Sequence, residues 1–126
     1  MSEDRFDFEN LKVYQKALEY VDFVYNSTKD FPKTEAFSLT DQFRRASISI
    51  ALNIAEGTGG SDAEFNQFLR IARRSIRECV AITEIAYRQG FAGDNFKKSS
   101  RYFCLELSRM ISGLMKSLKN KGEGNG

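Results

Sequence analysis

Arginine side chains recur in the third quarter of the chain at the spacing of one helix face. At i, i+3, i+4, i+7 and further along the same line, they are Arg70, Arg73, Arg74, Arg77 and Arg88. The planar guanidinium group binds phosphate through two parallel hydrogen bonds. A row of such groups on a rigid helix can follow a nucleic-acid backbone without reading its bases. The competing interpretation is a solvated face with local ion pairs, because Glu84 falls in the same arc.

The last quarter of the chain adds basic residues to this candidate surface. On the outer arc of the final predicted helix, they are Lys98, Arg101, Arg109, Lys116 and Lys119. The formal net charge is only +2, yet residues 36–126 hold fourteen basic and nine acidic side chains, and residues 1–35 hold five basic and eight acidic. The sequence therefore predicts a cationic surface in its later part. Several copies lying side by side would multiply its electrostatic field.

The composition argues against an enzyme. The chain contains no histidine, which removes the commonest general base and the commonest metal ligand. Glu-x-x-His pairs and Ser-His-Asp triads are therefore excluded, and the glycines at 57–60 match neither common phosphate-loop spacing. We predict no catalytic residue, no metal site and no cofactor. Cys79 and Cys104 fall on apolar helix faces and predict buried free thiols, with a disulfide or redox role as the alternative.

A polar residue interrupts the apolar seam of the second predicted helix. Asn53 stands where an apolar side chain would pack better, and a buried amide without partners costs about 1–3 kcal/mol. We predict an internal polar network that joins Asn53 and Glu56 to Ser75 or Glu78. The alternative is a structural role alone, in which Asn53 fixes the register of the helices.

The segments that position these residues follow helical periodicity. Apolar residues recur at spacings of three and four in residues 10–29, 39–57, 61–89 and 94–119. Ser38 with Asp41, and Ser61 with Glu64, have capping-box spacing, and the glycines at 57–60 and Gly90 suit left-handed helix ends. Long helices and short loops favour an all-α fold, an antiparallel up-down-up-down four-helix bundle.

The size of the chain favours one domain. We assign residues 1–120 to a single four-helix-bundle domain and residues 121–126, which are polar and glycine-rich, to a disordered tail. No apolar run approaches the ~18 residues needed to span a membrane. The acidic first ten residues lack the hydrophobic core of a signal peptide, so we expect a cytoplasmic protein.

The second predicted helix is apolar on two sides. One side forms a seam through Phe43 and Ile50. The opposite side carries Ile48, Ala51, Leu52 and Ala55. A helix that is apolar on two faces is buried on two faces. Because the other three helices cover one of them, we predict that the second is the interface of a homo-oligomer. Periodicity does not give the number of subunits.

Four segments carry a family resemblance over nearly the whole chain, from about Phe8 to Lys119. They are FENLKVYQKAL, DFPKTEAFSLTDQFRRASISIALNIAEG, EFNQFLRIARRSIRE and LSRMISGLMKSLK. The chain resembles the four-helix-bundle proteins encoded within 23S rRNA intervening sequences. That family is similar to the accessory variability protein of diversity-generating retroelements, a pentameric basic barrel that binds nucleic acid and a reverse transcriptase. Arg74 departs from the family pattern, which tends to have a small residue there.

The resemblance implies a four-helix bundle, a homo-oligomeric ring that is a pentamer, and a role in binding RNA. Combined with the basic stripe, it favours a non-enzymatic oligomer that binds RNA or DNA through backbone phosphates. The alternative is a protein-interaction scaffold or an accessory subunit for a partner enzyme such as a reverse transcriptase. The two differ in salt dependence, since only the first should weaken steeply as salt rises.

Overall fold

The computed structural model describes residues 5–124, and in that part of the chain it contains four α-helices and no strand. The all-α class predicted from the sequence is confirmed. The helices are α1 (Lys12–Thr28), α2 (Leu39–Gly57), α3 (Asp62–Arg88) and α4 (Asp94–Gly124). Two short 3-10 turns, η1 (Asp7–Asn10) and η2 (Lys33–Glu35), precede α1 and α2.

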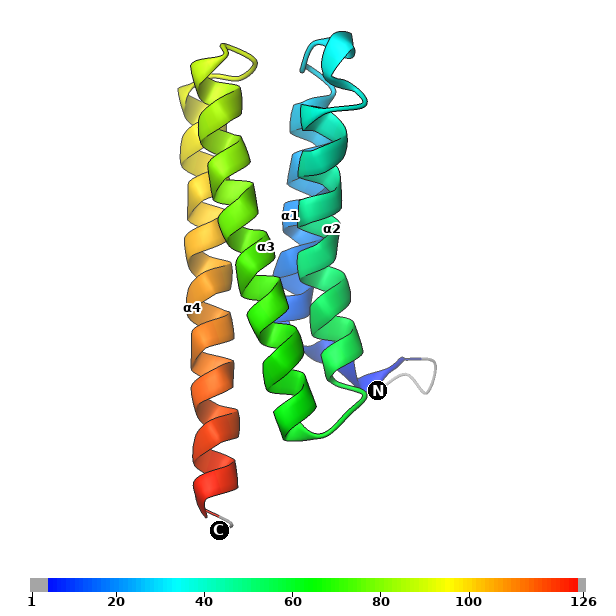
Figure 1. Cartoon of the computed structure of the whole chain (residues 1–126), viewed down its shortest axis with the longest axis vertical. Coiled ribbons are helices and arrows are strands. Elements are labelled where there is room, and N and C mark those ends of the chain that lie inside the picture. The colour runs from blue at the N-terminus through cyan, green and yellow to red at the C-terminus, as the bar shows by residue number, and fades with distance from the viewer. Residues whose placement is uncertain (1–4, 125–126) are drawn as a thin grey trace.

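The four helices lie along a common long axis, with packing consistent with a bundle (Figure 1). The α1–α2 and α3–α4 connections lie at one end of the molecule, and the α2–α3 connection lies at the other. Each helix packs against two others, and the most extensive packing is between α2 and α3. Among the described residues, no helix offers an apolar stretch of the length that crossing a lipid bilayer requires.

Aromatic side chains fill the end of the bundle that carries the α1–α2 and α3–α4 connections. Phe31 of the first connection and Phe91 of the second have ring centroids 5.8 Å apart. The same cluster contains Tyr20, Phe23, Phe43, Phe96 and Phe103. Tyr20 and Phe43 are completely buried. This cluster therefore ties the α1–α2 pair to the α3–α4 pair.

Two of the predicted helix ends are confirmed. The Ser61 hydroxyl accepts a hydrogen bond from the Glu64 backbone N–H at 3.2 Å, and the Glu64 carboxylate accepts one from the Ser61 N–H at 3.0 Å. These two bonds lower the pKa of the Glu64 carboxyl. Gly90 follows α3 with φ at +77°, the left-handed conformation that glycine adopts without steric cost.

Two other predictions about helix ends are wrong. Ser38 precedes α2 but makes no capping bond, because its hydroxyl donates to the Glu35 carboxylate of η2. No glycine between residues 57 and 60 takes a left-handed φ. Gly57 is needed for packing instead, because a Cβ there would lie 2.7 Å from Phe65 Cδ1 and 2.9 Å from Phe68 Cβ.

The last helix is longer than the sequence pattern predicts. α4 continues to Gly124, so residues 121–124, which we expected to be disordered, are helical. The Lys121 ammonium lies 3.9 Å from the Asp62 carboxylate at the start of α3, a contact that favours continuation of the helix. Residues 125 and 126 of the predicted tail lie outside the described residues.

Candidate nucleic-acid interface

The four clustered arginines of α3 are exposed. Arg70, Arg73, Arg74 and Arg77 lie within about two turns of the helix, and their side chains face solvent. Within residues 5–121, whose side chains the structure describes, none of them forms an ion pair. Of the competing interpretation, a solvated face with local ion pairs, the solvated face is present in this part of α3 and the ion pairs are not. Four uncompensated guanidinium groups on a rigid helix form the strongest candidate for phosphate contact.

The positive charge of the α3 arginine row is balanced by a carboxylate at its C-terminal end, at Arg88. Arg88 Nε lies 2.9 Å from one carboxylate oxygen of Glu84, and Lys97 Nζ of α4 lies 2.9 Å from the other. Hydrogen bonds from Arg88 and Lys97 lower the pKa of the Glu84 carboxyl. Arg88 is therefore the weakest of the five arginines as a phosphate ligand, because its charge is already balanced locally.

The basic residues of α4 divide in the same way. Arg109 lies 3.1 Å from the Glu106 carboxylate. The other four basic residues of α4 that the sequence assigned to this surface are exposed and form no ion pair within the described side chains, and these are Lys98, Arg101, Lys116 and Lys119. The uncompensated charge of α4 therefore adds to that of α3 on the same pair of helices.

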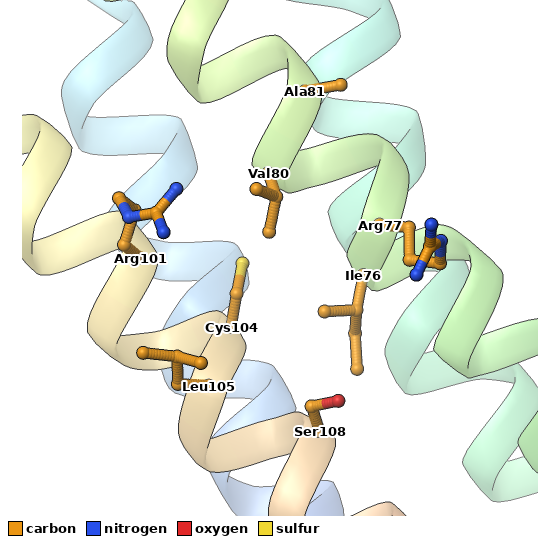
Figure 2. Close-up of a pocket in the computed structure, with 8 residues that line it drawn as sticks. All are labelled: Ile76, Arg77, Val80, Ala81, Arg101, Cys104, Leu105 and Ser108. Atoms are coloured by element: carbon orange, nitrogen blue, oxygen red, sulfur yellow. The ribbon is translucent and has the colours of Figure 1, made fainter.

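A hollow of about 400 Å³ lies between α3 and α4 at the surface of the molecule (Figure 2). Ile76 and Val80 extend from α3 toward Cys104 and Ser108 of α4. Two guanidinium groups flank the hollow on opposite sides, Arg77 from α3 and Arg101 from α4. The remaining lining residues are Ala81 and Leu105, so no carboxylate lines the hollow.

A second hollow of about 510 Å³ adjoins the first and shares Arg101 and Leu105 with it. Its other lining residues are Tyr87, Asp94, Lys97, Lys98 and Tyr102. The Tyr87 hydroxyl donates to the Asp94 carboxylate at 2.8 Å, which raises the pKa of the Tyr87 phenol. The Lys97 ammonium lies 4.3 Å from the Tyr87 ring centroid. The two hollows form one groove along α3 and α4, with arginine in its middle and tyrosine at one end.

Sequence comparison identifies the family. Residues 9–113 match the sequence model of the 23S rRNA-intervening sequence protein family. The chain belongs to that family. The match covers most of the chain, and it confirms the resemblance carried by the four segments described above. No curated protein sequence matches this family member.

A solved structure supports the fold of this family member. It is a crystal structure of a protein of unknown function from the S23 ribosomal protein family of Bacteroides thetaiotaomicron. The TM-score is 0.76 at 24% sequence identity, and the alignment covers 82% of this chain and 98% of the other. At this identity the likeness concerns the fold, and no activity is known for the neighbour.

The polar network between α2 and α3 of this family member has a different centre from the one we predicted. The Asn53 side-chain amide donates to the backbone carbonyl of Ser49 at 2.8 Å and to the Ser49 hydroxyl at 3.0 Å. The Ser75 hydroxyl of α3 donates to the same Ser49 hydroxyl at 2.9 Å. Ser49 therefore joins Asn53 to Ser75. Sequence analysis missed Ser49 as a member of the network, although it lies one turn before Asn53 on the same helix face.

The two glutamates assigned to this network lie outside it. Glu56 and Glu78 are both exposed, and the only side-chain hydrogen bond of either within the described residues joins Gln42 to Glu78 at 3.5 Å. Solvent hydrates a carboxylate at these positions, so neither glutamate needs an internal partner. The network is therefore a short hydroxyl and amide bridge between two helices, without ionisable groups.

A second buried polar cluster joins three helices and escaped sequence analysis. The Tyr20 hydroxyl of α1 shares a hydrogen bond of 2.8 Å with Ser100 of α4, and Ser100 shares one of 2.7 Å with Thr83 of α3. All three residues are buried. Burial raises the pKa of the Tyr20 phenol far above its usual value. The hydrogen-bonding partners are separated by up to eighty residues in the sequence, so no local spacing pattern predicts the cluster.

The two cysteines border this cluster, and both are buried free thiols, as predicted. The Cys104 thiol donates to the Tyr20 hydroxyl at 3.4 Å. Burial raises the pKa of Cys104 to about 11 and also raises that of Cys79. Both thiols are therefore protonated and poorly nucleophilic near neutral pH.

The predicted oligomer interface is only partly available to a second chain. Ala51 is 5% exposed and belongs to the core of its own chain. Ile48 and Ala55 are half-buried, whereas Leu52 is 54% exposed. Ala51 therefore cannot offer surface to another subunit. An interface on this side of α2 would rest on Leu52, with Ile48 and Ala55 beside it.

Proposed function

We propose that this protein is a cytoplasmic, non-enzymatic, homo-oligomeric RNA-binding protein that contacts its ligand through the outer surface of α3 and α4. The observation that carries the proposal is the group of four exposed arginines on α3 without an acidic partner. Arg70, Arg73, Arg74 and Arg77 can each contact a backbone phosphate without first breaking an ion pair.

The charges of α4 support the same surface. Arg101 and Lys98 border the groove that Arg77 also borders, and Lys116 and Lys119 continue along the outer side of α4. Contacts with phosphates position a nucleic acid without specifying its sequence. The proposed binding is therefore largely independent of sequence. The description of the family by 23S rRNA intervening sequences favours RNA over DNA as the ligand.

We further propose that antiparallel helices make up each protomer and that protomers assemble through the α1–α2 side into a ring, a pentamer by family resemblance. Three exposed apolar side chains support assembly there. They are Leu18 and Tyr25 of α1 and Leu52 of α2. The Arg44 guanidinium of α2 lies 4.4 Å from the Tyr25 ring centroid, which places Tyr25 on the side of α1 next to α2. Leu18 lies two turns earlier on the same face of α1.

The test of RNA binding is its salt dependence. A filter-binding titration with a 23S rRNA fragment at 50 and 200 mM salt should give a logarithmic slope near −0.7 for each phosphate contact. Four contacts would therefore give a slope of about −3. Absence of binding to RNA at 50 mM salt would contradict the proposal. Capture of a protein partner that survives both nuclease and high salt would favour the scaffold alternative.

The test of assembly is the mass in solution. Light scattering should give a multiple of the 14.4 kDa chain mass. Leu52→Glu should shift that mass to the monomer, because it places a charge in an apolar contact. The matched control is Leu105→Glu, which changes an equally exposed leucine in the α3–α4 groove and should leave the mass unchanged. A wild-type monomer at high concentration would contradict the assembly.

A further inference from the structure

We propose that the groove between α3 and α4 binds one nucleotide of single-stranded RNA, with the phosphate between Arg77 and Arg101 and the base against Tyr102 and Leu105. This inference rests on the proposed RNA-binding function and names the part of the surface that distinguishes a single strand from a duplex. The structural neighbour is a protein of unknown function, so its description assigns no ligand to this groove.

The phosphate position follows from charge. The hollow of about 400 Å³ is flanked on opposite sides by Arg77 and Arg101 and is lined by no carboxylate (Figure 2). Neither arginine forms an ion pair with any side chain of residues 5–121. The Ser108 hydroxyl adds a neutral hydrogen-bond donor at the same hollow. An anion of phosphate size placed there meets the Arg101 guanidinium and no opposing negative charge, and the flexible Arg77 side chain, which points away from α4 in Figure 2, turns toward it on binding.

The base position follows from the apolar and aromatic residues beside it. Tyr102 is 60% exposed and lines the second hollow, which shares Arg101 and Leu105 with the first. An exposed ring next to a cationic groove is the arrangement on which unpaired bases stack. The Lys16 ammonium lies 5.8 Å from the Tyr102 ring centroid and extends the positive field at this end.

The neighbouring tyrosine is a poorer platform for a base. Tyr87 is half-buried and is held by its hydrogen bond to Asp94. The Lys97 ammonium lies 4.3 Å from the Tyr87 ring centroid, closer than Lys16 lies to that of Tyr102. The Asp94 carboxylate in the second hollow also disfavours a phosphate there. We therefore assign the phosphate to the first hollow and the base to the second. The nucleotide then lies across Arg101, with its phosphate on the Arg77 side and its base on the Tyr102 side.

The geometry predicts a preference for single strands. Bases of an RNA duplex are stacked and paired inside the helix, so they cannot reach Tyr102, whereas an unpaired base can be splayed onto it. The volume of the first hollow falls within the range of about 300–1,000 Å³ that small-ligand sites occupy. A whole duplex would contact the arginines of α3 from outside the groove.

The experiment compares a labelled ten-nucleotide poly(A) single strand with an RNA duplex of equal length, using the full chain at low salt. Tyr102→Leu should weaken single-strand binding by about ten-fold through loss of stacking and leave duplex binding unchanged. Tyr102→Phe keeps the ring and should bind as the wild type does. The double variant Arg77→Gln with Arg101→Gln should reduce the magnitude of the single-strand salt slope by about 0.7, because the two arginines share one phosphate.

The outcomes separate this inference from the proposed function. Failure of the wild type to bind either RNA would overturn both. Binding of both RNAs with equal affinity, unchanged by Tyr102→Leu, would leave the basic surface intact and overturn the groove. Circular dichroism of each variant confirms folding, and because all three substituted residues are exposed we expect native helicity. A protein ligand lost on Arg77→Gln with Arg101→Gln, with RNA affinity unchanged, would also overturn the groove assignment.

Discussion

The two halves of the molecule use their arginines differently. In the α1–α2 half, Arg44 lies over the Tyr25 ring and donates to the Thr28 hydroxyl at 2.9 Å, while Arg45 lies 2.9 Å from the Asp41 carboxylate. In the α3–α4 half, four consecutive helix-face arginines have no acidic partner within the described residues. Residues 1–60 hold seven basic and ten acidic side chains, and residues 61–126 hold twelve and seven.

This difference indicates that a candidate phosphate-binding surface is recognised by arginines without intramolecular partners, and not by the number of arginines. An arginine that already stacks or pairs must give up that contact before it binds a phosphate, whereas an unpaired one loses only hydration. The Arg44–Arg45 pair and the Arg73–Arg74 pair look alike in the sequence. Their neighbours in the fold distinguish them, and only the second pair is free to bind a ligand.

The largest expected effect concerns the buried cluster that joins the two halves. Tyr20 and Cys104 both have raised pKa values in the folded chain, so the unfolded chain loses their protons at lower pH. The contribution of these two groups to the free energy of unfolding is fully present below about pH 9, the ordinary pKa of a thiol. It is lost as the pH rises above that value. The free energy of unfolding should fall by about 1.4 kcal/mol per pH unit for each group that titrates.

Urea unfolding followed by circular dichroism between pH 8 and pH 11 measures this alkaline loss. The matched variant is Tyr20→Phe with Cys104→Ala, which should be less stable at pH 8 but should lose stability less steeply above pH 9. A wild-type stability that stays constant to pH 11 would mean that the cluster does not hold the halves together as described.

The second effect concerns the turn between the halves. Gly57→Ala should lower the free energy of unfolding by about 1–3 kcal/mol, because its Cβ would overlap Phe65 and Phe68. Gly59→Ala is the control, since the nearest atom to its Cβ would be the Glu56 carbonyl oxygen at 3.4 Å. Chemical denaturation of both variants gives the comparison, and equal stabilities would contradict the close approach of α2 and α3.

The smallest expected effect concerns the carboxylate that balances the charge of Arg88 at the end of α3. Glu84→Gln removes the carboxylate that pairs with Arg88 and Lys97, so it should release both cations. We expect a change in stability of no more than about 0.5 kcal/mol, as is usual for exposed ion pairs. RNA affinity at low salt should rise, and the salt slope should become steeper by about 0.7 for each newly available phosphate contact. An unchanged slope would show that Arg88 lies outside the interface.

Local signals in the sequence predicted part of the fold well. The Ser61–Glu64 box and Gly90 depend on residues within one helical turn, so their spacing alone identified them. Helix ends decided by neighbours were predicted wrongly. Ser38 is drawn to Glu35, and Gly57 is set by two phenylalanines of another helix. A cap predicted from spacing can therefore be overridden by a competing local acceptor, as at Ser38, and a glycine can be required by packing against another helix, as at Gly57.

The candidate site was predictable only as a row of charges. The helical spacing of Arg70 to Arg77 placed them on one face, but the compensation of Arg88 depends on Lys97 of another helix meeting the same glutamate. The groove likewise needs residues of α3 and α4 brought together across the connection between them. Ser49 and the Tyr20 cluster were missed for the same reason, since each acts through a partner on a different helix.

The most direct test of the account compares charge-matched variants of the two halves. One variant changes Arg70, Arg73, Arg74 and Arg77 to Gln, and the other changes Lys12, Lys29, Lys33 and Arg45, which are also exposed, to Gln. The two variants carry the same net charge. We predict that the first lowers the magnitude of the salt slope of RNA binding by about 3 and that the second leaves it nearly unchanged. Equal losses in both variants would contradict the account, because binding would then follow net charge and not the surface of α3 and α4.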